Sequence, residues 1–134
     1  MKRGPRFPGL DEIIEIHRDQ LDRYGGRGGL RDLGLLESAV AMPRAGIRGE
    51  YFHRNHFEMA AAYVFHLVRN HPMVDGNKRV GAVAGLIFLA LNGVQVRSSN
   101  SALARMILRV ARGNIGKDEI AEFFRRHARG PRKR

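Results

Sequence analysis

Residues 71–79 read HPMVDGNKR and connect the two most apolar segments of the chain, Phe57–Arg69 and Val80–Leu91. Helices that are apolar on most sides pack at the centre of a helical bundle. The proline at the second position of the stretch cannot continue the first helix, and Asp-Gly-Asn favours a turn, so the second helix is expected to begin near Asn77 or Lys78. The polar groups of this turn must reach the surface or line a cleft, because burying an unpaired charge is costly. The stretch therefore predicts a polar turn between two core helices.

The rest of the chain also follows a helical pattern, with apolar residues recurring every three or four positions. Four further helices are predicted: Leu10–Tyr24, Leu35–Met42, about Ala102–Arg112 and about Asp118–His127. A glycine-rich loop or short hairpin is expected over Gly25–Gly34, and a short strand over Val94–Val96. The 134 residues fit one domain, and no internal repeat or composition break divides them. We predict a mostly all-α single domain over residues 1–134, a helical bundle with at most a short β-hairpin.

The chain has a formal net charge of +11, and most of the excess lies at its two ends. Residues 1–6 and 125–134 hold nine of the 24 basic residues and none of the 13 acidic ones, which leaves 15 basic residues against 13 acidic residues between them. We expect flexible basic tails over residues 1–7 and 128–134, able to add affinity for a polyanion such as an acidic protein partner. This distribution argues against direct nucleic-acid binding as the main function.

Composition also limits where the protein is expected to act and which kinds of site it can contain. The absence of cysteine excludes disulfides, a thiolate nucleophile and cysteine-bound zinc. The longest apolar run, Val80–Leu91, is shorter than the roughly 20 residues of a membrane-spanning helix, and no signal peptide is recognised at the start. His53 and His56 have a metal-like spacing but no evident third ligand, so surface or capping roles are favoured, and His66 is expected to face the core. A cytoplasmic protein without a membrane partner is expected.

The first turn of the second core helix combines features that suit an anion. Its N–H groups lack partners within the helix, and the helix dipole is positive at this end. Gly76 allows the backbone to approach a phosphate closely, and Asn77 follows it. Lys78 and Arg79 lie in the same turn, where cations are unfavourable unless a negative ligand offsets them. Together these four residues predict a cradle for a polyphosphate.

Two further residues of the turn could supply a metal ligand and a base beside this cradle. Asp75 precedes the cradle and is placed to hold the Mg²⁺ that accompanies a nucleotide. His71 lies across the turn and could deprotonate an attacking hydroxyl near neutral pH. The alternative is an ordinary turn, with Lys78 and Arg79 in solvent and His71 capping the preceding helix. The concentration of all these residues between two apolar helices favours the site.

The stretch resembles the signature of the Fic/Doc family, H-x-F-x-D/E-G-N-G/K-R. The flanking sequences FEMAAAYVFHLVRNH and AGLIFLALNGVQV, and the earlier HRDQLDRYGGRGGLRDLGLLESAV, are similar to the corresponding helices and loop of the family. The resemblance covers most of residues 10–125 and points to the death-on-curing (Doc) branch, whose members are toxins of toxin–antitoxin pairs. It implies a Fic/Doc fold with a nucleotide site, using ATP or another nucleoside triphosphate with Mg²⁺.

The resemblance also implies a role for each residue of the turn. The implied roles are base for His71, Mg²⁺ ligand for Asp75, anion nest for Gly76 and Asn77, and phosphate contacts for Lys78 and Arg79. Phosphoryl or nucleotidyl transfer needs mainly positioning and charge neutralisation, which these residue types supply.

Four positions depart from the common family pattern. Met73 replaces the usual phenylalanine that anchors the loop in the core, and Val83 replaces an asparagine found in some Doc members. Lys78 and Ala82 differ from the Gly and second Arg of AMP-transferring Fic enzymes, and both changes are shared with the Doc branch. That branch is known for transferring the terminal phosphate to a threonine of elongation factor Tu. We therefore expect phosphate transfer from ATP to a Thr or Ser hydroxyl of a translation protein, with AMP transfer as the alternative.

The expected partners follow from the same resemblance. The chain lacks the Ser/Thr-x-x-x-Glu motif by which some Fic enzymes inhibit themselves, which implies inhibition in trans by a separate antitoxin. An acidic antitoxin tail is expected to bind a groove on the bundle. In Fic relatives a flap beside the cleft pairs with the target, and here either Gly25–Gly34 or Arg44–Tyr51 could serve. A non-catalytic basic binding module is the alternative from a different functional class.

Overall fold

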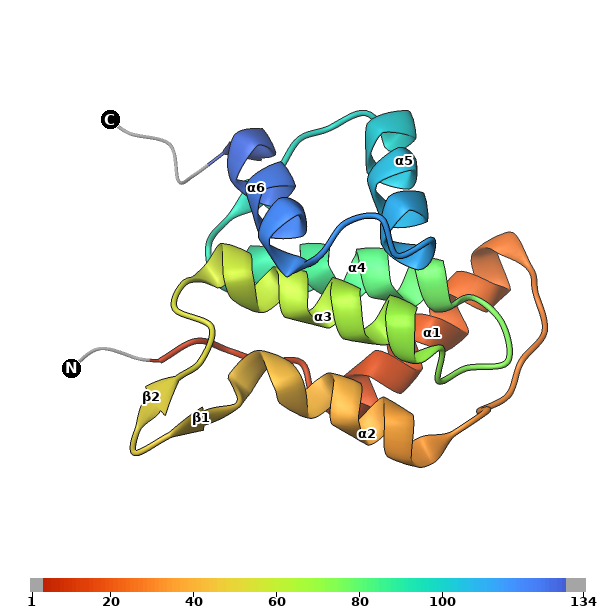
Figure 1. Ribbon diagram of the computed structural model, residues 1–134. Coiled ribbons are helices and arrows are strands. Elements are labelled where there is room, and N and C mark those ends of the chain that lie inside the picture. The colour runs from red at the N-terminus through yellow and green to blue at the C-terminus, as the bar shows by residue number, and fades with distance from the viewer. Residues whose placement is uncertain (1–3, 130–134) are drawn as a thin grey trace.

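The computed structural model describes residues 4–129 and shows a bundle of helices with two very short sheets (Figure 1). Each predicted helix is present, and the bounds differ from the prediction by a few residues at most. The helices are α1 (Leu10–Tyr24), α2 (Leu33–Ala41), the 3₁₀ turn η1 (Met42–Arg44), α3 (His56–Asn70), α4 (Asn77–Leu91), α5 (Asn100–Ala111) and α6 (Lys117–His127). The prediction of a mostly all-α fold is confirmed. No helix in this described part of the chain has the length and apolar character required to cross a membrane.

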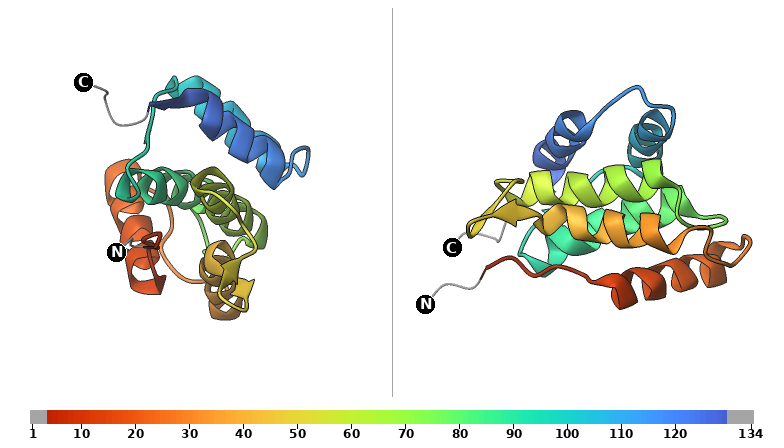
Figure 2. Two further views of the ribbon diagram at one scale, coloured as in Figure 1. Left: turned by 90° about the vertical axis from the view of Figure 1, so that its left-hand side faces the viewer. Right: turned by 60° about the horizontal axis from the view of Figure 1, so that its bottom comes forward.

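Helices α3 and α4 lie side by side at the centre of the bundle and the other helices cover them (Figure 2). Helix α1 packs on α4, α2 packs on α3, and α5 and α6 contact the pair from the other side. The largest buried side chains at this centre include Tyr63, Phe88 and Phe124, each with no exposed surface. Two glycines of α4 let α3 approach closely, because a Cβ atom at Gly85 would lie 2.8 Å from Cγ2 of Val64. The core therefore fixes the relative position of the two helices that flank the polar turn.

The strands differ in part from those expected. Strands β1 (Gly46–Ile47) and β2 (Glu50–Tyr51) form a small antiparallel hairpin. The expected strand near Val94 is confirmed as β3 (Gln95–Val96), which pairs with β4 (Ala128–Arg129). The glycine-rich segment is a loop, with a single bridge between Leu30 and Met73.

The predicted tails need a correction at their inner ends. Phe7 packs against the core with its ring centroid 5.4 Å from that of Phe88, and Ala128 and Arg129 form β4. These residues belong to the fold because each is held by packing or by strand pairing. Arg6 is also held, because its N–H donates to Oδ1 of Asn92 and its carbonyl accepts from Nδ2 of the same residue. Residues 1–3 and 130–134 of the expected tails lie outside the described residues.

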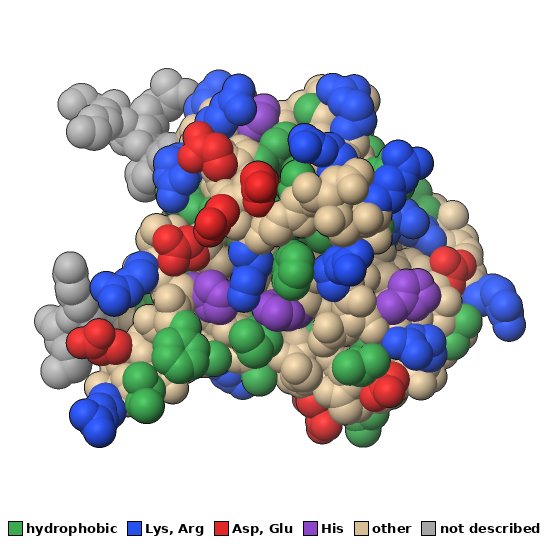
Figure 3. Space-filling model, viewed as in Figure 1, with side chains coloured by type: hydrophobic (Ala, Val, Ile, Leu, Met, Phe, Trp, Pro, Cys, Tyr) green, Lys and Arg blue, Asp and Glu red, His purple; other side chains and the backbone are tan. Residues whose placement is uncertain are grey.

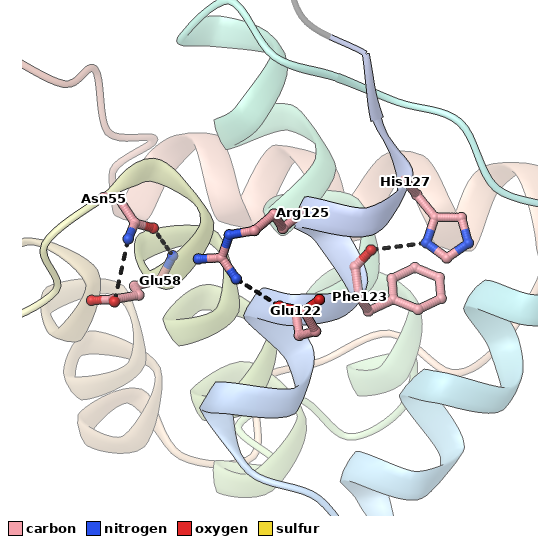
Figure 4. Close-up of polar contacts among 6 residues, drawn as sticks. All are labelled: Asn55, Glu58, Glu122, Phe123, Arg125 and His127. Carbon is pink, nitrogen blue, oxygen red and sulfur yellow. Dashed lines mark hydrogen bonds and ion pairs between the residues drawn. The ribbon is translucent and has the colours of Figure 1, made fainter.

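Side chains bond to backbone groups at the start of α3 and near the end of α6 (Figure 4). At the start of α3, Oδ1 of Asn55 accepts a hydrogen bond of 2.9 Å from the Glu58 N–H. At the end of α6, Nδ1 of His127 lies 2.8 Å from the carbonyl oxygen of Phe123. The asparagine side chain thus pairs an N–H group at the start of α3 that has no partner within the helix.

The turn between α3 and α4 is closed by a buried amide. Asn77 is 4% exposed, its Oδ1 accepts from the Met73 N–H at 2.9 Å, and its Nδ2 donates to the Met73 carbonyl at 3.0 Å. Met73 is 2% exposed and packs in the core, which confirms the expected anchor of the loop. The Asn77 side chain thus satisfies both backbone polar groups of Met73, the residue that anchors the turn in the core.

We expect Asn77→Ala to lower the free energy of unfolding by about 2–4 kcal/mol, since it leaves a buried N–H and a buried carbonyl without partners. Urea denaturation followed by circular dichroism measures the change. Asn114→Ala, which removes an exposed amide, is the matched control. Equal unfolding midpoints for the two variants would contradict this role of Asn77.

A second polar cluster lies away from the turn, where the loop before α3 meets the start of α6. Nζ of Lys117 lies 3.2 Å from Nε2 of His53 and 3.3 Å from Nε2 of His66. Burial, reinforced by the Lys117 ammonium, lowers the pKa of His66 to about 4 and also lowers the pKa of His53. The part of the chain that the structure describes has no group of three or more metal-ligating side chains. Because an ammonium group can only donate, the ring nitrogens of both histidines accept from Lys117.

The lowered pKa of His66 predicts a loss of stability in mild acid. Between pH 6.5 and 4 the unfolded chain binds a proton at this histidine that the folded chain does not, so stability falls as pH falls through this window. We expect a decrease of about 1–2 kcal/mol, allowing for solvent screening at a half-buried position. Urea midpoints at pH 7 and pH 5 should differ less in His66→Gln than in the wild type, and identical differences would contradict the assignment.

Candidate active site

All six residues predicted for the site line one cleft with a volume of about 420 Å³. It lies at the turn between α3 and α4, where the C-terminal end of one helix and the N-terminal end of the other meet (Figure 1). Val68, Arg69 and Ala111 complete the lining. The six residues are His71, Asp75, Gly76, Asn77, Lys78 and Arg79.

His71 ends α3 in a left-handed backbone conformation, with a φ of 54°. Such a conformation in a residue other than glycine costs of order 1–3 kcal/mol and persists only where the surroundings enforce it. Here the carbonyl oxygen of His71 accepts a hydrogen bond of 2.6 Å from Nε of Arg31. The side chain is exposed on the cleft, where an imidazole can meet a hydroxyl of another molecule.

Asp75 is held as a carboxylate by backbone donors on two sides. Its Oδ1 accepts from the Gly76 N–H at 2.9 Å, and its Oδ2 accepts from the Arg27 N–H at 3.0 Å. These hydrogen bonds, followed by the charges of Arg79 and Arg27, hold the pKa of Asp75 below its ordinary value. Each oxygen still has a lone pair free of these bonds, so the donor chemistry fits a hard cation such as Mg²⁺. A site with one carboxylate suits Mg²⁺ bound together with phosphates and water.

Gly76 caps α4 with a φ of 81°, and no side chain occupies the cap position. A Cβ atom at Gly76 would also lie 3.3 Å from Nε2 of His17. The first N–H groups of α4 therefore remain for a ligand or water. Asn77 takes part through its backbone only, because its amide side chain is used to close the turn at Met73. This refines the sequence-based role of Asn77 in the anion nest.

Lys78 and Arg79 add to the positive charge that Arg69 brings to the cleft. Lys78 is exposed, and the half-buried Arg79 donates from Nη1 to the Gln20 carbonyl at 3.3 Å. A Cβ atom at Gly26 would lie 2.9 Å from Oδ2 of Asp75 and 3.0 Å from Nη2 of Arg79, so these two side chains converge on the same glycine. Figure 3 shows that Lys and Arg side chains gather on the right-hand half of this face, over α5 and around the α3–α4 turn.

The glycine-rich loop frames the cleft, and the hairpin does not. Backbone N–H groups of Arg31 and Asp32 donate to the Pro72 carbonyl, and the Val74 N–H donates to the Gly29 carbonyl. The β1–β2 hairpin lies at the opposite end of α3 from the turn (Figure 1). Of the two flap candidates, Gly25–Gly34 is the one beside the cleft.

Three residues of the site were not identified from the sequence. His17 is 6% exposed, and its Nε2 lies 2.7 Å from the Asp75 carbonyl oxygen. Arg69 lines the cleft, and its Nη1 donates to the Ala111 carbonyl at 3.1 Å. Arg31 donates to the carbonyl oxygen of His71. The polar His17 on an otherwise apolar helix face was an available signal. Arg31 and its partners lie far apart in the chain, so no local sequence pattern indicates that they are in contact.

A larger and more apolar groove of about 580 Å³ adjoins the cleft and shares Lys78 and Arg79 with it. Ala82 and Val83, two of the departures from the family pattern, line this groove. Its remaining lining comes from α1 and α5, including the exposed Tyr24 and Leu108. The small side chain at position 82 thus leaves an open apolar surface next to the cations.

The sequence is similar to known proteins along most of its length. A model of the Fic/DOC family matches residues 7–89. The chain is 34% identical over 116 residues to "Protein kinase doc" of Escherichia phage P1, a match that spans 87% of this chain and 90% of that protein. It is 45% identical over 73 residues to "Toxin Doc" of Mycolicibacterium smegmatis (strain ATCC 700084 / mc(2)155), spanning 54% of this chain and 56% of that protein. With its helical bundle and its motif turn, the chain belongs to the Fic/DOC family.

Proposed function

We propose that this chain is a Doc-like toxin that transfers the γ-phosphate of ATP to a Ser or Thr hydroxyl of a translation protein such as elongation factor Tu. The observation that carries the proposal is the convergence of His71, Asp75 and the α4 N-terminus on one cleft. The names of the two relatives, a protein kinase and a toxin, support it.

The residues of the cleft suit each part of the reaction. His71 would accept the proton of the target hydroxyl while the hydroxyl oxygen forms a bond to the γ-phosphorus and the bond to the β-phosphate oxygen breaks, releasing ADP. The N–H groups after Gly76, with Lys78 and Arg79, would offset the charge of the triphosphate. Asp75 is the residue suited to hold Mg²⁺, which when bound neutralises phosphate charge.

The direct test uses purified protein, elongation factor Tu and ATP labelled at either the α or the γ phosphate. We expect label on the target from γ-labelled ATP only, and its loss in His71→Ala because the proton acceptor is gone. His127→Ala, a histidine at the far end of α6, is the matched control and should keep full transfer. Label from α-labelled ATP would show AMP transfer instead, and no label from either would count against an enzymatic function on this target.

The partner of the toxin is proposed to be an antitoxin that binds in trans in the apolar groove beside the cleft. An amphipathic acidic segment would bury apolar side chains there and place carboxylates near Lys78 and Arg79, where the triphosphate would otherwise bind. Occupation of the groove would thus compete with the nucleotide through shared cations. The groove is reachable, because Leu108 on its rim is 37% exposed.

Co-expression with the small protein encoded beside the toxin gene should restore growth to cells that produce the toxin. Leu108→Glu should leave toxicity intact and abolish this rescue, because it puts a like charge in the path of the acidic segment. Leu91→Glu, at a comparably exposed leucine outside the groove, should be rescued normally. Rescue of both variants alike, or of neither, would contradict the groove as the antitoxin site.

A further inference from the structure

The glycine-rich loop is attached to the motif turn by backbone hydrogen bonds that fix its position along several residues. Pro72 accepts from the N–H groups of Arg31 at 2.8 Å and Asp32 at 3.0 Å, and the Val74 N–H donates to the Gly29 carbonyl at 3.0 Å. The backbone of Arg31 therefore cannot move away from the turn without breaking contacts on both sides of it. The Cα atom from which the Arg31 side chain extends is thus held in place.

From that point the Arg31 guanidinium reaches the last two carbonyls at the end of α3. Nη2 donates to the Asn70 carbonyl at 2.9 Å, and Nε donates to the His71 carbonyl at 2.6 Å. Because His71 adopts a left-handed conformation, the helix cannot continue and these carbonyls have no later N–H groups to accept from. A planar guanidinium with two parallel donors matches them, and a cation is favoured at a helix C-terminus.

We infer that Arg31 is a positioning residue, which locks the left-handed conformation of His71 and so directs its imidazole into the cleft. This inference rests on the proposed function, since it assigns how the proposed base is held. The φ and ψ angles of residue 71 set the direction of its Cα–Cβ bond, so a change to the right-handed region would turn the imidazole away from the N-terminus of α4. Arg31 is itself exposed, and its side chain touches neither Asp75 nor the α4 residues through any hydrogen bond in the described structure.

The position of Arg31 separates its effect from that of the phosphate cradle. The start of α4 is held by His17 at the Asp75 carbonyl, by Gln20 at Arg79 and by the Asn77 amide, and none of these contacts involves Arg31. Loss of the Arg31 side chain should therefore leave nucleotide binding intact and lower the rate of the chemical step. A residue that only stabilised the fold would affect both.

The experiment compares the wild-type chain with Arg31→Ala, Arg31→Lys and the charge-matched control Arg23→Ala, a surface residue of α1 paired with Asp19. For Arg31→Ala we expect kcat to fall by about 10- to 100-fold and KM for ATP to change by less than about threefold. Arg31→Lys keeps the charge but not the two-donor geometry, so its kcat should lie between those of the wild type and Arg31→Ala. Arg23→Ala should match the wild type.

A second readout does not need activity. A positive φ brings the amide and Hα protons of residue 71 close together, which gives a strong NOE within that residue in NMR spectra. We expect this NOE to weaken in Arg31→Ala and to persist in Arg23→Ala. An unchanged kcat in folded Arg31→Ala, or a lower kcat with the NOE unchanged, would overturn the positioning role. If wild type and His71→Ala are equally inactive, the proposed function fails instead, and the NOE alone decides whether Arg31 holds residue 71.

Discussion

The paired hydrogen bonds between the Asn77 amide and the backbone of Met73 are the constraint on which the site depends. They lie at the buried base of a turn that joins the two central helices, where an unpaired backbone group is costly. By closing the turn they fix where α3 must end and where α4 must begin. The ends of two core helices then face one cleft, with a carbonyl-rich terminus on one side and an N–H-rich terminus on the other.

Contacts from the glycine-rich loop and from α1 complete the site. The glycine-rich loop donates backbone N–H groups to the motif turn and to Asp75, and His17 of α1 contacts the Asp75 carbonyl. These contacts join residues that are 40 to 58 positions apart in the chain. The Asp75 carboxylate and the backbone of His71 are consequently held by contacts with distant segments, while both side chains line the cleft.

The sequence was sufficient to predict the helices and six of the nine residues that line the cleft, because both depend on local patterns. Apolar spacing identifies helices, and the polar turn between two apolar segments has no other plausible placement than a cleft or the surface. The contacts from Arg31 and Arg69 depend on tertiary packing between distant segments, so no local pattern indicates them, whereas the polar His17 among apolar residues of its helix was a local signal. The hairpin at residues 46–51 was considered only as one of two possible flaps, since its strands are two residues long. The role of the Asn77 side chain was missed for the same reason, because a turn residue can direct its amide to a ligand or to its own loop.

The central claim is that a triphosphate with its Mg²⁺ binds at the N-terminus of α4 beside His71. Titration of ¹⁵N-labelled protein with ATP and Mg²⁺, followed by NMR, tests it most directly. We expect the amide signals of Gly76 through Arg79 and the imidazole signals of His71 to shift together and to saturate at one ligand per chain. Saturable shifts confined to another part of the bundle, with these signals unmoved, would contradict it.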